Sequence, residues 1–273
     1  MPITADWHIH TRNSCDQASL TVADLLAGAA ALGMTDFGVT DHLHTPVNLP
    51  DLVASRAEFD AAAPPPTVHF GVELSSVSRW ELDAIATGAH GAPTYGLRDG
   101  GPADGPLALG ITAEALRALG VEYVVAGAHW PMYVPYEREA IIRDYHRQNL
   151  FLAAHPLVTI VAHPWWWMGH WQAEDGSYRA EPWFDDFGAI PASMHDEFAA
   201  AALQHGTVVE INLCAQLLHP GYPERYKAQY LDYLAMLKAR GVPLSIGSDC
   251  HHPRYDIDFP RAEAMLATVG ITD

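Results

Sequence analysis

Two histidines that alternate with apolar residues stand near the start of the sequence. In the stretch ADWHIHTRNSCD, residues 5–16, only Ile9 separates His8 from His10, and Asp16 follows them. Side chains two positions apart on a β-strand point to the same side, so a strand here would direct both imidazoles to one place. Imidazole and carboxylate groups together suit Zn²⁺, Mn²⁺ or Fe²⁺. The spacing therefore indicates the first two ligands of a metal site.

Residues of the same chemical kind recur at the ends of other short apolar runs. They are His42, Glu73, His129, His163, Asp249 and His251. In the stretch GSDCH, Asp249 and His251 repeat the two-residue spacing of the first pair. Only three cysteines are present, so a thiolate-rich structural zinc site is excluded.

Seven runs rich in Val, Ile and aromatic residues predict the strands that position these groups. The runs are Asp6–His10, Phe37–Asp41, Val68–Leu74, Tyr123–Ala128, Val158–Ala162, Val208–Asn212 and Leu244–Gly247. Helices are expected between them, the first capped by Thr21 and ended by Gly33. The other expected helices are Leu52–Ala62, Thr112–Leu119, Glu137–Ala154, Ala192–Gln204, Glu224–Arg240 and Arg261–Val269.

This alternation of strands and helices predicts a parallel sheet with helical crossovers. The expected fold is α/β, a distorted TIM-like (β/α)7 barrel that forms a single domain over residues 1–273. Residues 90–110 and 165–190 are expected to be long insertions at its rim. Barrels of this kind build their sites at the carboxyl ends of the strands. Six of the seven predicted strands end in a metal-type ligand, which places the expected site at that end.

The composition limits the classes of function. A formal net charge of −18 argues against a long nucleic-acid partner, because that binding depends on neutralised phosphates. No apolar run approaches the roughly 18 residues that a membrane span requires. The first residues lack the pattern of a secretory signal. We therefore expect a cytoplasmic protein with a small-molecule substrate, and the sequence leaves its oligomeric state open.

Taken in order, these motifs resemble those of a known family. The motifs are HIH with Asp16, VTDH, GVEL, GAHW, VAHP and GSDCH, and they resemble the PHP family, named for polymerase and histidinol phosphatase. The resemblance covers essentially the whole chain. It implies a seven-stranded barrel that holds two to three divalent ions and hydrolyses phosphoesters by attack of a metal-activated hydroxide.

The resemblance also implies how the ligands divide among the ions. His8, His10, Glu73 and Asp249 would hold the first ion. Glu73 would bridge to the second ion, which His129 and His163 complete. Asp16, His42 and His251 would hold a third. His44 lies two residues after His42, so either histidine could be the ligand, and Asp16 could instead cap a turn.

Other residues are candidates for contacts with the substrate. Arg12 and Arg254 follow predicted ligands, and an arginine fork suits phosphate oxygens, so we expect them to assist catalysis with Glu73 and Asp249. Four tryptophans follow predicted ligands closely and could line an aromatic pocket or simply pack the loop; they are Trp130, Trp165, Trp166 and Trp167. Asn212 ends the sixth predicted strand and could bind substrate or pack.

Three functions are compatible with these residues. The leading hypothesis is a metal-dependent phosphoesterase acting on a small phosphate monoester, with histidinol phosphate as one candidate. The alternative is an amidohydrolase-like enzyme that cleaves C–N or C–O bonds. Many such enzymes bridge two metals with a carbamylated lysine, but the only lysines, Lys227 and Lys238, lie on a predicted outer helix. A non-catalytic metal-binding domain is the third hypothesis.

Overall fold

The computed structural model describes residues 2–88, 94–97, 99–167 and 182–272. Its strands are β1 (Ala5–Asp6), β2 (Asp36–Val39), β3 (His42–Leu43), β4 (Val68–Ser78), β5 (Leu107–Leu109), β6 (Tyr123–Gly127), β7 (Ile160–Val161), β8 (Val208–Asn212) and β9 (Leu244–Gly247). Its α-helices are α1 (Val22–Leu32), α2 (Leu49–Ala62), α3 (Arg79–Ala86), α4 (Ala113–Ala118), α5 (Arg138–Ala154), α6 (Ala192–His205), α7 (Glu224–Ala239) and α8 (Phe259–Ala267).

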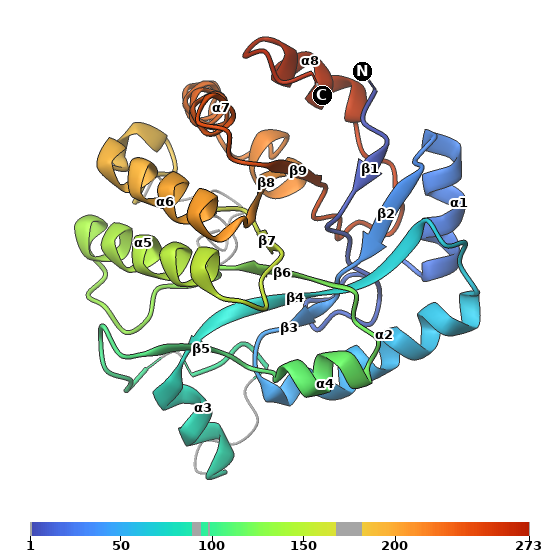
Figure 1. Cartoon of the computed structure of the whole chain (residues 1–273), viewed down its shortest axis with the longest axis horizontal. Coiled ribbons are helices and arrows are strands. Elements are labelled where there is room, and N and C mark those ends of the chain that lie inside the picture. Colours follow the sequence, from blue (N-terminus) through green and yellow to red (C-terminus); the bar gives the residue numbers. More distant parts are fainter. Residues whose placement is uncertain (1, 89–93, 98, 168–181, 273) are drawn as a thin grey trace.

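Seven of the strands form a nearly closed parallel barrel. Their order is β1-β2-β4-β6-β7-β8-β9, and every neighbouring pair is parallel. The seam between β1 and β9 is joined by a hydrogen bond from Trp7 N to Ile246 O at 3.0 Å and by a parallel bridge between Ile9 and Cys250. Helices surround the strands, and β1 lies next to the carboxyl-terminal helix α8 (Figure 1). The expected TIM-like barrel of seven strands is confirmed.

Local sequence signals explain where α1 begins and ends. The Thr21 side chain accepts a hydrogen bond from Asp24 N, which satisfies one of the free donors of the first turn. Gly33 ends the helix with φ of 72°, in the left-handed region that favours glycine. Both predictions for this helix are confirmed.

The structure differs from the expected elements beyond the third strand. Strand β4 continues to Ser78, where its last three residues pair with the antiparallel strand β5, and α3 lies between the two strands in sequence. Residues 107–109 are therefore part of the sheet and not of an irregular loop. Residues 90–93, 98 and 168–181, in the two predicted rim insertions, lie outside the described residues.

The barrel interior is apolar at one end and polar at the other. Tyr123, Val125, Ile160 and Val208 pack together near the amino-terminal ends of the strands with Trp7. On β8, Glu210 and Asn212 continue the face that begins with Val208, because side chains alternate along a strand. The interior thus changes from apolar to ionisable toward the carboxyl ends, which is where the candidate site lies.

Candidate metal centre

Four buried side chains form the first set of candidate ligands. His8 and His10 follow β1, Glu73 lies in β4 and Asp249 follows β9. The Nε2 atoms of the two histidines lie 3.0 Å apart. The Glu73 Oε2 atom lies 3.0 Å from His8 Nε2 and 3.3 Å from His10 Nε2. Asp249 Oδ1 lies 3.2 Å from His10 Nε2, so ligand atoms from three strands converge on one point.

Glu73 also belongs to a second set. Its other oxygen, Oε1, lies 2.8 Å from His163 Nε2 and 3.1 Å from His129 Nε2. The two histidines come from the ends of β7 and β6, and all three side chains are buried. One carboxylate therefore faces both sets, one oxygen to each.

A third set lies beside the first. His42 Nε2 is 3.1 Å from Asp16 Oδ2, and His251 Nε2 contacts the same carboxylate. The structure adds His10 to this group, since its ring stacks between those of His42 and His251 with centroid distances of 4.3 and 4.1 Å. The expected grouping of Asp16, His42 and His251 is thus reproduced in space.

His44 is adjacent to these sets but differs from His42. Its Nδ1 atom pairs with Ser75 Oγ at 2.7 Å, and the same hydroxyl lies 2.8 Å from His129 Nδ1. His42 has one ring nitrogen near Asp16 and the other 2.9 Å from Glu73 Oε2. His42 therefore contacts the carboxylates of two sets, although His42, His44 and His129 also form a group that could hold an ion.

The donor atoms fit divalent metal ions. Among the described residues, several buried polar atoms of these sets make no hydrogen bond of suitable geometry, although some lie close to an ionisable group of another ligand; they are Asp16 Oδ1, Glu73 Oε2, His42 Nδ1, His129 Nε2 and His163 Nδ1. Leaving such groups unsatisfied in the interior costs free energy. An ion held by the surrounding nitrogen and oxygen atoms would remove that cost, and the ligand types suit Zn²⁺, Mn²⁺ or Fe²⁺.

The local electrostatics favour the ligand forms of the carboxylates. Burial opposes ionisation of Glu73, but His42, His8 and His129 lower the pKa of its carboxyl well below the usual range. Burial lowers the pKa of His129 to about 4, so this ring is neutral at pH 7. Burial also disfavours charge on His42, yet Glu73 and Asp16 raise its pKa to about 10. A metal ion must displace that proton, so loading should release protons.

The two predicted phosphate-binding arginines do not contact the three sets. Arg12 Nε donates to Glu58 Oε2 at 2.9 Å, and its side chain is 58% exposed. Arg254 lies 3.6 Å from Asp256 with 84% of its side chain exposed. Both lie in segments that follow ligands, and their role remains a prediction.

The structure separates the predicted pocket residues. Trp165 and Trp167 are 0% and 1% exposed, and both pack against Trp183 in the core. The expectation that these two rings line a substrate pocket is therefore wrong. Trp166 is partly exposed, and its ring lies 5.5 Å from that of His163. Trp130 is 4% exposed, with its ring 5.4 Å from that of His44.

The structure also decides between the two roles expected for Asn212, which were to bind substrate or to pack. Its side chain is fully buried, and Nδ2 donates to Glu210 Oε2 and Asp249 Oδ2, each at 3.0 Å. Its Oδ1 accepts a hydrogen bond from Ala215 N at 2.8 Å. These bonds use both donors of the buried amide, so Asn212 holds its neighbours and does not face substrate.

Sequence reasoning missed Glu210 and Ser75. Glu210 Oε1 lies 2.6 Å from His8 Nδ1, and Ser75 Oγ lies between His44 and His129. The sequence signal that could have identified Glu210 is its position inside the otherwise apolar run at Val208–Asn212. A carboxylate buried in such a strand needs charged or hydrogen-bonding partners.

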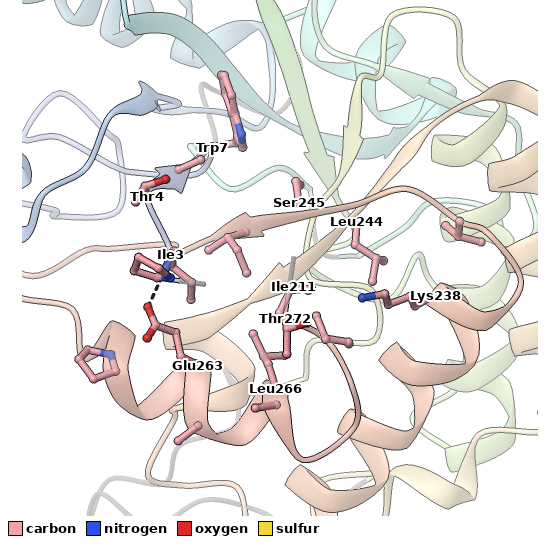
Figure 2. A pocket seen from close by; sticks show the side chains of 18 residues that line it. Ile3, Thr4, Trp7, Ile211, Lys238, Leu244, Ser245, Glu263, Leu266 and Thr272 are labelled. Atoms are coloured by element: carbon pink, nitrogen blue, oxygen red, sulfur yellow. Dashed lines mark hydrogen bonds between the residues drawn. The ribbon is translucent and has the colours of Figure 1, made fainter.

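A separate cavity of about 870 Å³ lies at the opposite end of the barrel. It opens between the segment before β1, the start of β9 and helix α8. Figure 2 shows Glu263 beside Ile3, and the Glu263 carboxylate accepts a hydrogen bond from Ile3 N at 2.6 Å. Its lining is mostly apolar and includes none of the candidate metal ligands.

None of the helices in the described residues has the length and apolar character that a membrane span requires.

Comparisons with known proteins support the fold. No protein-family model matches the sequence, and no curated protein is significantly similar to it. A Listeria monocytogenes protein whose assignment as a histidinol phosphatase is provisional has a similar structure. The TM-score is 0.61 and the identity 11%, over 93% of this chain and 97% of that one. A Xaa-Pro dipeptidase aligns over 98% of this chain and 70% of its own, with 11% identity, but its TM-score of 0.43 is too low to support an argument. The first similarity shows that the chain shares a barrel fold of this type.

Proposed function

We propose that this protein is a metal-dependent phosphoesterase that hydrolyses small phosphate monoesters. The observation that carries the proposal is the position of Glu73, whose two oxygens face two separate sets of histidines. With the group of Asp16, His42 and His251 beside them, these residues fit two to three divalent ions. Bound ions of this kind would act as Lewis acids toward a phosphoryl group and activate water for attack.

The chain's own residues hold the ligands in place. Ser75 fixes the Nδ1 atom of His129, which leaves Nε2 directed at Glu73. Glu210 does the same for His8. Hydrogen bonds of this kind set the tautomer and orientation of a ligand ring.

The charge balance favours an anionic substrate. Asp16, Glu73 and Asp249 contribute −3 and Glu210, in contact with His8, a further −1, so three divalent ions with +6 would leave +2 at the site. This local surplus would attract a phosphate dianion into a protein whose formal net charge is −18. Arg12 and Arg254 would supply further donors to the phosphate oxygens.

The amidohydrolase-like alternative is less well supported. Both lysines lie on α7, which runs outside the barrel (Figure 1). Lys227 Nζ is 3.7 Å from Glu224, and Lys238 Nζ donates to Gly270 O at 3.1 Å. Neither lies in the candidate ligand sets, which argues against a carbamylated lysine bridge, and Glu73 would take the bridging position instead.

Aromatic rings near the metal sets suggest the kind of leaving group. Trp166 lies beside His163, and the ring of Tyr95, which is 40% exposed, lies 5.5 Å from that of His44. A planar or apolar leaving group could stack here. Histidinol phosphate is one such substrate, and the provisional name of the Listeria protein agrees with it.

The test is hydrolysis of a panel of phosphomonoesters, phosphodiesters, carboxylic esters and amides by metal-loaded protein. We expect phosphate release from monoesters, lost in His8→Ala and Asp249→Ala. Cleavage of esters or amides without release of phosphate would overturn the proposal and favour the amidohydrolase-like alternative.

A further inference from the structure

Glu210 is a buried carboxylate that touches a ligand of the first set. It lies on the inner face of β8 and is 1% exposed. Its Oε1 atom lies 2.6 Å from His8 Nδ1, so the ring donates from Nδ1 and directs Nε2 toward Glu73 and Asp249. Gly247 in β9 leaves room for this contact, because a Cβ there would lie 1.8 Å from Glu210 Oε1.

The other oxygen of Glu210 reaches the second set. Oε2 accepts hydrogen bonds from His163 N at 2.6 Å and from Asn212 Nδ2 at 3.0 Å. Asn212 Nδ2 also donates to Asp249 Oδ2 at 3.0 Å, which extends the network to another ligand of the first set. One carboxylate is thus connected to His8, His163 and Asp249, which follow three different strands.

Two of the connected ligands have unfavourable backbone conformations. His163 has φ of 27° and Asp249 has φ of 54°, backbone angles that residues other than glycine rarely adopt. Such conformations persist only where neighbouring contacts hold them. Glu210 binds the backbone N–H of His163, and Asn212 binds the carboxylate of Asp249.

We propose that Glu210 is a positioning residue that couples the first and second ligand sets, so that loss of its charge weakens metal binding at both. The inference rests on the proposed metal centre. A glutamine cannot replace it, because Glu210 accepts hydrogen bonds at both oxygens and a glutamine amide would place its NH₂ group against one of these donors.

Glu122 offers a matched control at the opposite end of the barrel. Its Oε2 pairs with His69 Nδ1 at 2.8 Å, and its Oε1 accepts a hydrogen bond from Phe70 N at 3.1 Å. The pairing resembles that of Glu210, but His69 belongs to none of the candidate metal sets.

The experiment is titration of metal-free protein with Co²⁺, followed by its visible absorption bands and by competition with a chelator. Glu210→Gln is measured in the wild-type background, in His129→Ala, which damages the second set, and in Asp249→Ala, which damages the first. We expect Glu210→Gln to weaken Co²⁺ binding about 10- to 100-fold in all three backgrounds. Glu122→Gln should leave the affinity unchanged.

An effect of Glu210→Gln in only one background, or in none, would overturn the coupling. If Glu210→Gln does not fold, Asn212→Ala tests the network, because it removes the contact to Asp249 and should weaken the site that remains in His129→Ala. Unchanged Co²⁺ affinity in that variant would also contradict the inference. Failure of wild-type protein to bind Co²⁺ would refute the proposed metal centre itself.

Discussion

Glu73 Oε1 and His163 Nε2 lie 2.8 Å apart, although Glu73 is in β4, His163 follows β7 and β6 separates these strands in the sheet. The other Glu73 oxygen faces His8 and His10. The side chain can reach both sets because it points into the barrel at the level where the polar interior begins. This arrangement makes the two sets one structural unit.

Arg254→Ala should raise the KM for phosphomonoesters about 10- to 100-fold with a smaller change in kcat. Hydrogen bonds to charged groups contribute about 1.5–3 kcal/mol, and within the described residues the Arg254 guanidinium has only a 3.6 Å contact with Asp256. Arg12→Ala should have a weaker effect, because Glu58 engages its guanidinium. Steady-state kinetics check both, with Arg117→Ala on α4 as the control. Equal kinetics for Arg254→Ala and wild type would remove Arg254 from the site.

Trp166→Ala should reduce the preference for aromatic leaving groups. A stacked aromatic pair contributes about 0.5–1.5 kcal/mol, so KM for phenyl phosphate should rise roughly 2- to 10-fold. KM for glycerol phosphate should not change, since its leaving group has no ring. A parallel loss for both substrates would mean that Trp166 supports the loop and not the substrate.

Metal removal should lower thermal stability. An ion present at about 1,000 times its Kd stabilises the folded state by about 4 kcal/mol, which corresponds to a Tm shift of roughly 10 °C in a protein of this size. Calorimetry with and without a chelator measures the shift. The chelator should have a smaller effect on Asp249→Ala, which lacks one ligand of the first set; an identical shift would contradict the assignment.

Stability should also fall as the pH decreases from about 6.5 to 4, partly because of His195. Burial among Trp165, Phe187 and Tyr233 lowers the pKa of His195 to about 4, while Asp196 opposes and His146 reinforces this shift. Since the unfolded chain takes up the proton first, protonation favours unfolding across this window by roughly 2–3 kcal/mol.

The pH dependence of the unfolding free energy, measured with denaturant, tests this assignment. His195→Phe should show a shallower slope than wild type between pH 6.5 and 4. His205→Gln, which changes an exposed histidine in the last turn of α6, should keep the wild-type slope. An unchanged slope in His195→Phe would show that other groups dominate.

The barrel and the convergence of the ligands at one end of it could be predicted because both follow from local patterns, whereas the division of the ligands into sets was implied by the resemblance to the PHP family. Val208–Asn212 and Leu244–Gly247 have the predicted bounds, and the ligands follow strand ends as expected. Parallel strands bring those ends together whatever the loops do. This is why Glu73 and His163, far apart in sequence, could be assigned to one site.

Contacts that depend on side-chain packing could not be predicted in the same way. The sequence WWW at residues 165–167 does not reveal that its first and third rings enter the core while Trp166 stays partly exposed. The antiparallel pairing of β5 with the end of β4 requires the chain to reverse direction between the two strands, and the periodicity of apolar residues does not indicate that reversal. Glu210 was overlooked because its role depends on His8 and His163, which reach it from other strands.

The central claim is that Glu73 is shared by two metal-binding sets. Elemental analysis of purified protein, wild type and Glu73→Gln, tests it most directly, with Glu122→Gln as the control. We predict two to three divalent ions per chain in wild type and the control, and fewer in Glu73→Gln, where the second set loses its only carboxylate and the first set keeps only that of Asp249. A full complement of ions in Glu73→Gln, or none in wild type, would contradict it.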